Sequence, residues 1–480
     1  MRKVIGFLVG SAILGAIACS DDGSLGGSDN TSSSTSSSTS GGPGSSTSTS
    51  GSPGVDLTKP IETIDADVTM SRTLDNKKNW LLKNTVYVKA GQTLTIEKGT
   101  TIFGDNQTKA ILVIEPGAKL LAEGTAEEPI VFTSQAPEGE KRAGDWGGVV
   151  LLGKAPINVP GGKGNIEGIL KTVAGTEYGG DDPNDDSGVI KYVRIEYAGV
   201  ILSPDNEVNG LTFGGVGAGT TVDYVQVRMS LDDCFEFFGG TVNAKHLVCQ
   251  RNQDDAFDFD NGYTGKLQFL VLQQDPDHVG EDNGFESDND ATGTANLPLT
   301  NPTVFNVTLC GKNKEVDNAQ FGLLVRRNAR GSFNNMIVTG FESSLDVRDA
   351  TGAALLSPVA GQPQLDIKGT LFFNSKGNGV VDDIAYPETG AAAPNKDNDN
   401  GLNEVEWVMG GARGNAKTDP GISCFDASAP VFGPATSLTA GALTPPNDGF
   451  FDSSAAYIGA FKDANDTWAT TGKWVVWSDK

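Results

Sequence analysis

The chain of 480 residues has very little histidine and none of the common enzyme signatures. Its two histidines, His246 and His278, have no cysteine or histidine partner at zinc-binding spacing, so we do not expect a zinc enzyme. A nucleophile elbow, a phosphate-binding glycine-rich loop and a dinucleotide fingerprint are also missing. No long segment has the 3.6-residue period of an α-solenoid.

Basic residues are scarce as well. The chain has 36 Lys and Arg against 61 Asp and Glu, which gives a formal net charge of -25. Such a body repels nucleic acid and anionic bilayer surfaces, whereas cations and neutral or basic surfaces are better partners. We therefore expect no nucleic-acid partner.

An acidic-aromatic phrase occurs three times, at Asp232–Phe237, Asp254–Asp260 and Asp282–Asp288. The second copy begins 22 residues after the first, and the third begins 28 residues after the second. Each copy alternates apolar and polar residues, which is the pattern of a strand with one buried face. Repetition at this spacing indicates a solenoid, since a propeller blade needs about 40 to 45 residues.

A second strand pattern recurs between these copies. Its occurrences are Tyr192–Ile195, Tyr224–Val227, His246–Cys249, Leu267–Phe269, Phe305–Val307 and Asn335–Val338. Two short strands per coil, separated by Gly, Asn and Asp turns, predict an all-β chain folded as a parallel β-helix.

The N-terminal region has the features of an export signal. Residues 1–18 join two basic residues to a short apolar run, and this run is shorter than the roughly 20 residues of a spanning helix. Residues 16–19 resemble a bacterial lipobox, in which Cys19 would carry the lipid, including palmitate. Residues 19–54 are almost entirely Ser, Thr, Gly, Asp and Pro, so we expect a disordered tether after the lipidated cysteine.

The remainder divides into two parts. Residues 55–350 are predicted to form the β-helix, with residues 55–80 covering its open N-terminal end. Residues 161–188 are predicted to be a long loop that helps build a binding face. Residues 351–480 are predicted to contain the last coils, an irregular insertion and an aromatic C-terminal cap.

Four cysteines remain after Cys19, and they allow three disulfide pairings. Cys249 aligns with the inward-facing Val227, so a buried free thiol is the favoured interpretation for it. A bond between Cys310 and Cys424 is conceivable. The sequence alone does not decide the partner of Cys234.

Stacking of the coils brings the acids of the repeats together. Equivalent residues of neighbouring coils lie about 4.8 Å apart. One predicted column consists of Glu236, Asp258 and Glu286, and a second of Asp232, Asp254 and Asp282. Two carboxylates at this distance repel by about 3 to 4 kcal/mol at an effective dielectric near 20. Protonation would relieve the repulsion, and so would a bound cation.

A hard divalent cation is the more economical solution at neutral pH, and we predict a Ca²⁺ site. The candidate ligands are Asp232, Asp233, Glu236, Asp254, Asp255, Asp258, Asp260, Asp282, Glu286 and Asp288. The alternative is a solvated acidic face that binds no ion. Basic candidates for binding, or for proton abstraction in a lyase, are Lys245, Arg251, Arg326, Arg327 and Arg348.

Several phrases carry a family resemblance. They are Leu94–Thr100, Glu123–Ser134, Gly144–Gly148, Tyr192–Gly199 and Phe238–His246. In these phrases the chain, over about residues 75–345, resembles a group of uncharacterised surface lipoproteins of bacteria with two membranes. The resemblance implies a right-handed parallel β-helix of the pectin-lyase-like type, anchored at the outer membrane. It implies no catalytic residue.

The sequence thus predicts a lipoprotein of the cell envelope at the outer membrane, exposed at the cell surface, with a monomeric body held to the membrane by its lipid. Its predicted role is non-catalytic binding of, or adhesion to, a glycan or an outer-membrane partner protein, with calcium as a stabilising ion. The alternative is a calcium-dependent polysaccharide lyase or glycoside hydrolase.

Overall fold

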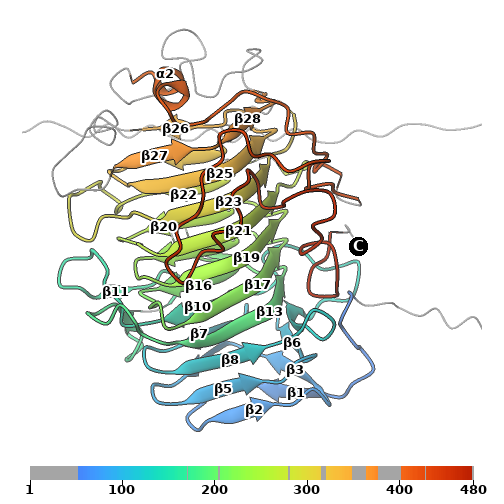
Figure 1. The fold of residues 1–480 in the computed structure, drawn as a ribbon. Helices are drawn as coiled ribbons and strands as arrows, with labels where there is room; N and C mark the ends of the chain where they lie inside the picture. The colour runs from blue at the N-terminus through green and yellow to red at the C-terminus, as the bar shows by residue number, and fades with distance from the viewer. Residues whose placement is uncertain are drawn as a thin grey trace, which may run out of the picture. The chain divides into compact units, whose positions relative to one another are not determined.

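The computed structural model shows a right-handed parallel β-helix (Figure 1). The described residues are 52–169, 171–203, 206–278, 280, 282–314, 320–348, 364–376, 402–426 and 429–477. The fold class predicted from the repeats is confirmed. The predicted signal, Cys19 and the tether up to residue 51 lie outside the described residues. No helix in the described part of the chain is long and apolar enough to cross a membrane.

One side of the solenoid is a parallel sheet of nine strands. In order they are β4 (Thr85–Val88), β7 (Ile111–Ile114), β10 (Gly148–Leu152), β16 (Leu211–Gly214), β18 (Phe235–Phe238), β20 (Phe257–Asp260), β22 (Phe285–Ser287), β24 (Leu323–Val325) and β26 (Asp346–Val347). The three acidic-aromatic phrases supply β18, β20 and β22, so each copy belongs to one coil as predicted.

The second sheet has fifteen strands. They are β1 (Ile61–Ile64), β2 (Arg72–Leu74), β3 (Asn79–Leu82), β5 (Thr93–Ile96), β6 (Thr101–Gly104), β8 (Lys119–Glu123), β9 (Ile130–Ser134), β13 (Gly188–Glu196), β17 (Thr221–Arg228), β19 (Asn243–Gln250), β21 (Lys266–Gln273), β23 (Thr303–Cys310), β25 (Gly331–Thr339), β27 (Leu365–Lys368) and β28 (Leu371–Phe373). Two short antiparallel hairpins lie outside both sheets. They pair β11 (Gly164–Asn165) with β12 (Glu177–Tyr178), and β14 (Val200–Ser203) with β15 (Asn206–Val208).

Each long strand from β13 to β25 bends at one residue in the left-handed region. These residues are Tyr192, Tyr224, His246, Phe269, Asn306 and Asn335, with φ between 50° and 64°. The bend divides the strand over two faces, so a coil has three sides, and the prediction of two short strands per coil was too simple. A left-handed residue costs about 1 to 2 kcal/mol. Ring stacking offsets part of this cost, since the rings of Tyr192 and Tyr224 lie 4.5 Å apart.

Phenylalanines from successive repeats form a column inside the solenoid. The ring centroids of Phe235 and Phe257 are 5.5 Å apart, and those of Phe257 and Phe285 are 5.3 Å apart. All three side chains are fully buried. The coils are therefore stacked in register, as the repeat predicts.

The two ends of the solenoid differ from the prediction. Residues 55–80 do not form a separate cap, because they contain β1, β2 and the start of β3, which are strands of the long sheet. At the other end, helix α2 (Glu404–Met409) begins at Asn403, whose side chain accepts a hydrogen bond from the Glu406 amide. Val408 on this helix is part of the solenoid core. The helix therefore covers the last coils.

The aromatic tail runs along the side of the solenoid and not over its end (Figure 1). Outward amide side chains of the long sheet hold it: Asn306 Nδ2 donates to the carbonyls of Ala455 and Tyr457. Gln226 pairs with both backbone groups of Val476 in the same way. Two tryptophans of the tail pack on the stacked rings at the strand bends: Trp474 contacts Tyr192, and Trp468 contacts His246.

The folded body also begins earlier than predicted. The buried guanidinium of Arg194 donates to Ser52 Oγ at 3.2 Å and to the carbonyl of Pro53. Residues 52–54 are thus part of the body and not of the tether. Their composition gives no sign of this, since the partner is distant in sequence.

The four cysteines form two disulfides, so the prediction of a free thiol at Cys249 is wrong. Cys234 and Cys249 are bonded inside the solenoid, with their Cα atoms 5.8 Å apart. Cys249 does face inward, but so does Cys234, which stands directly before β18 on the other side of the core. Cys310 at the end of β23 is bonded to Cys424, which fixes the returning tail to the coils.

Candidate functional site: an acidic groove

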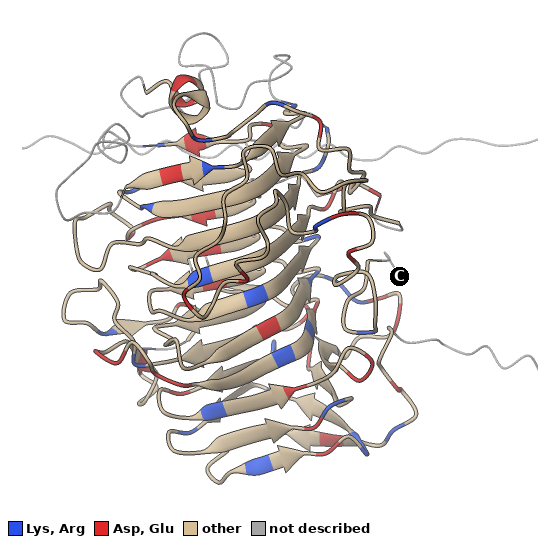
Figure 2. Ribbon diagram, in the orientation of Figure 1, with Lys and Arg blue, Asp and Glu red and all other residues tan. Residues whose placement is uncertain are grey.

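A groove of about 750 Å³ lies over the nine-stranded sheet, from β18 to β24. Its acidic lining residues are Glu167, Glu207, Asp232, Asp233, Glu236, Asp254, Asp255, Asp258, Asp260, Glu286 and Asp288. Its basic lining residues are Arg326, Arg327 and Arg348. On the long sheet, by contrast, charged residues of both signs are scattered (Figure 2). Nine of the ten predicted calcium ligands line this groove.

The first predicted column of carboxylates is present. Glu236 is the register partner of Asp258, and Asp258 is the partner of Glu286. Thr212 precedes the column on β16, and Leu324 follows it on β24. The acidic stretch is therefore limited to three consecutive coils.

A ladder of polar side chains fixes the turns that lead into these strands. Asp233 Oδ1 accepts a hydrogen bond from the amide of Asp255 at 2.8 Å, and Asp255 Oδ1 accepts one from the amide of Asn283 at 2.7 Å. Asn283 continues the ladder to Phe321 at 3.0 Å. One oxygen of each of these two carboxylates is thus used for structure, while the residues still line the groove.

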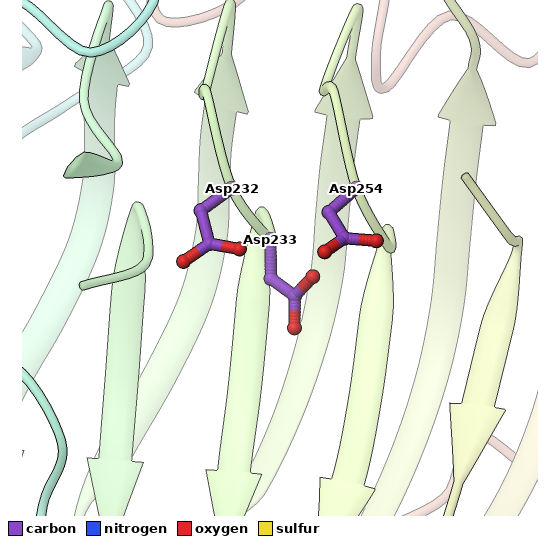
Figure 3. A group of neighbouring side chains, drawn as sticks. All are labelled: Asp232, Asp233 and Asp254. Carbon is purple, nitrogen blue, oxygen red and sulfur yellow. The ribbon is translucent and has the colours of Figure 1, made fainter. Parts of the chain in front are cut away.

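Two groups of carboxylates have a spacing that suits a cation. Oxygens of Asp232, Asp233 and Asp254 lie within 4.8 Å of one another, and Figure 3 shows these side chains converging from two neighbouring turns. Asp233, Glu236 and Asp258 form a second group with the same limit. Both groups share Asp233.

Asp232 is 7% exposed, and its Oδ2 has no hydrogen-bond partner in the described part of the chain. Oδ1 of Asp258 also has no hydrogen-bond partner among the described residues. Burying a carboxylate oxygen without a hydrogen-bond donor costs free energy, and either a proton or a bound cation would remove this cost at both atoms.

Asp282 does not belong to the second column, and this part of the prediction is wrong. Its Oδ1 lies 2.6 Å from Lys312 Nζ and 2.7 Å from Gln320 Nε2, away from the groove lining. The coil before it is six residues longer than the preceding one, as the spacings of 22 and 28 residues show. Register alone therefore did not fix the direction of this side chain.

Burial is the main cause that raises the pKa of the groove carboxyls. It raises the pKa of Asp260 to about 7, and it raises that of Asp232 to about 7 with a further contribution from Glu207. Burial and then neighbouring acids raise the pKa well above the usual range at six more residues. These are Asp233, Glu236, Asp254, Asp255, Asp258 and Glu286. Without a cation, several of these groups hold protons at neutral pH.

The arginines lie at one end of the groove and are all paired. Arg326 contacts both oxygens of Asp288, at 2.9 and 3.1 Å, and also contacts Glu286. These two carboxylates raise the pKa of Arg326 above its usual value against the effect of burial. Such an arginine is a poor proton acceptor, which disfavours a lyase that would use it as the base. Arg327 pairs with Asp288 as well, and Arg348 pairs with Asp346.

Two of the predicted binding residues do not line the groove. Lys245 lies on the long sheet, with its Nζ 4.9 Å from the ring centre of Phe450 in the returning tail. Arg251 lies at the end of the long sheet, 3.8 Å from Asp275. Conversely, sequence reasoning missed Glu167, Glu207 and Asn209, which line the groove. The loop 161–188, predicted to serve a binding face, supplies Glu167. The other two residues have no repeat that could have indicated them.

The residues fit a calcium ion in donor type and spacing. Ca²⁺ binds six to eight oxygen ligands at about 2.3 to 2.6 Å, so two ligands of one ion lie up to about 5 Å apart. Both three-carboxylate groups satisfy this limit. The buried oxygens without hydrogen-bond partners, Asp232 Oδ2 and Asp258 Oδ1, support a bound cation independently of the number of acids in the groove.

The comparison with family models identifies the class of protein. The model of the pectate-lyase-like β-helix domain matches residues 66–410, so the chain belongs to this family. Searches of the curated proteins and of the solved structures found no significant match.

Proposed function

We propose that the protein is a lipid-anchored binding module of the cell envelope, and that its acidic groove holds Ca²⁺ and binds a glycan through it. The observation that carries the proposal is that eleven carboxylates and three paired arginines line the same groove. A bound Ca²⁺ that keeps open coordination positions can accept oxygen ligands from a sugar. The lipobox-like Cys19 and the tether after it support the membrane anchor and the position at the outer membrane.

An acidic glycan fits this groove better than a neutral one. Its carboxylates would complete the coordination of the ion and face the arginine end of the groove. Without calcium, the same carboxylates would meet a surface of like charge and be repelled. Binding should therefore depend strictly on the cation.

The test measures binding of the full chain to acidic and neutral polysaccharides with calcium and with a chelator. We expect retention on an acidic glycan with calcium, and a loss of about tenfold or more in affinity for Glu236→Gln and Asp258→Asn. Asp366→Asn, a change of the same kind on β27 of the long sheet, is the matched control and should bind normally. Calcium-independent binding, or equal binding by the groove variants, would contradict the proposal.

A glycoside hydrolase remains the second candidate because of one observation. Burial and then the neighbouring Asp288 and Asp290 raise the pKa of Asp260 to about 7, as required of a carboxyl that donates a proton at neutral pH. The same screen separates the two functions, since new reducing ends would indicate hydrolysis. Capture of an outer-membrane protein without glycan binding would favour a partner protein instead.

A further inference from the structure

A buried lysine–aspartate pair lies outside the groove and has no part in the proposed function. Lys312 follows β23, and Asp282 precedes β22. The Nζ–Oδ1 distance is 2.6 Å, and both side chains are completely shielded from solvent. Ion pairs elsewhere in the described chain, such as Lys266 with Asp448, keep at least one partly exposed side chain or involve arginine.

The hydrogen-bonding groups around this pair are poorly matched to two charges. An ammonium group has three donors, but within the described residues Lys312 Nζ donates to one acceptor, Asp282 Oδ1. That oxygen also accepts from Gln320 Nε2, whereas Oδ2 of Asp282 has no hydrogen-bond partner among the residues that the structure describes. Burying two charges costs several kcal/mol per ion unless further hydrogen bonds satisfy them. An uncharged link between the two side chains would remove this cost.

We propose that Lys312 and Asp282 are joined by an intramolecular amide bond. The amine nitrogen attacks Cγ of the carboxyl group, and a nitrogen–carbon bond forms. The bond between Cγ and Oδ2 breaks, and this oxygen leaves as water with one proton from the carboxyl and one from the amine. Nothing is oxidised or reduced, so no co-reactant is needed.

The surroundings favour the neutral forms that this condensation requires. Burial is the largest influence on both groups: it raises the pKa of Asp282 to about 6 and lowers the pKa of Lys312, although the attraction between the two groups acts in the opposite direction on each. Transfer of one proton within the pair yields an amine and a carboxylic acid. The Gln320 amide, 2.7 Å from Oδ1, polarises the carbonyl group and stabilises the oxygen as negative charge develops on it. After the reaction Oδ1 remains as a carbonyl oxygen that accepts this hydrogen bond.

The bond would link two segments that flank the groove. Asp282 stands just before the turn of Asn283 that carries the polar ladder, and Lys312 just after Cys310, which holds the returning tail. The amide would therefore fix the entrance of β22 to the end of β23. It would also explain why Asp282 is not available as a calcium ligand.

The test is peptide mapping of the full chain after denaturation, reduction and cleavage at glutamate. We expect a branched peptide that joins the segment of Asp282 to that of Lys312 and is one water lighter than the two peptides together. Lys312→Arg keeps the positive charge but removes the amine, so it should give the two separate peptides. Gln320→Leu should lower the yield of the branched peptide.

The exposed pair Lys266 and Asp448 is the internal control in the same digest. Its atoms are as close, at 2.5 Å, yet both side chains are accessible to water and should remain unlinked. Recovery of unlinked Asp282 and Lys312 peptides from folded wild-type protein would overturn the proposal. A loss of water confined to the Asp282 peptide, as in a succinimide, would overturn it as well.

Discussion

The calcium-free protein is expected to be more stable at pH 5 than at pH 8. Asp260 illustrates the cause, since burial raises its pKa from 3.8 to about 7. Between these two values the folded state holds a proton that the unfolded state has lost, so the free energy of unfolding falls as the pH rises toward 7. Asp260 alone contributes about 3 kcal/mol to the difference between pH 5 and pH 8.

Other groove carboxyls act in the same direction, because burial and like charges raise the pKa of Asp233, Glu236 and Asp258. Glu196 acts in the opposite direction. Arg194 and Arg228 lower its pKa to about 2 against burial, so its contribution is lost only as the pH falls below about 4.5. The comparison therefore stays at pH 5 or above.

Melting temperatures of protein stripped of calcium at pH 5, 6, 7 and 8 test this prediction. Asp260→Asn should reduce the difference, whereas Asp181→Asn, at an exposed position in the loop 161–188, should leave it unchanged. Saturating calcium at pH 8 should recover most of the lost stability. A melting temperature that rises steadily from pH 5 to pH 8 in calcium-free protein would contradict the account of the groove.

Phe257→Ala is expected to destabilise the protein by about 3 to 5 kcal/mol, the range for truncating a fully buried phenylalanine. Phe257 is 0% exposed and lies between Phe235 and Phe285 in the interior column. Its loss leaves a cavity between two coils that are fixed by strand pairing on both sheets, so the site has little freedom to collapse.

Denaturant unfolding of the two proteins measures this effect. Phe450→Ala is the matched control, because Phe450 lies half-exposed in the returning tail and should cost less than about 1 kcal/mol. Equal effects of the two substitutions would mean that the phenylalanine column does not carry the stacking of the coils.

The sequence allowed prediction of features that depend on register. The repeats at Phe235 and Phe257 align residue by residue, so the interior column and the Glu236–Asp258–Glu286 column follow from strand pairing alone. The bends of the long strands were missed because Tyr224 or His246 in a left-handed conformation does not resemble a turn residue. Their stacking on neighbouring rings becomes visible only in three dimensions.

Features that depend on distant segments could not be predicted. The returning tail was expected to cover an end of the solenoid, but its backbone pairs with outward amides such as Gln226 and Asn306. Asp282 was expected in the groove, and a lysine 30 residues away determines its position instead. Periodicity contains no information about either partner.

Calorimetric titration of the calcium-free full chain with Ca²⁺ at pH 7.5 tests the central claim most directly. We expect saturable binding with a dissociation constant below about 1 mM. Asp233→Asn should weaken binding strongly because both three-carboxylate groups use this residue, while Asp366→Asn should bind like the wild type. Absence of saturable calcium binding, or unchanged binding by Asp233→Asn, would contradict the claim that the groove is a calcium site.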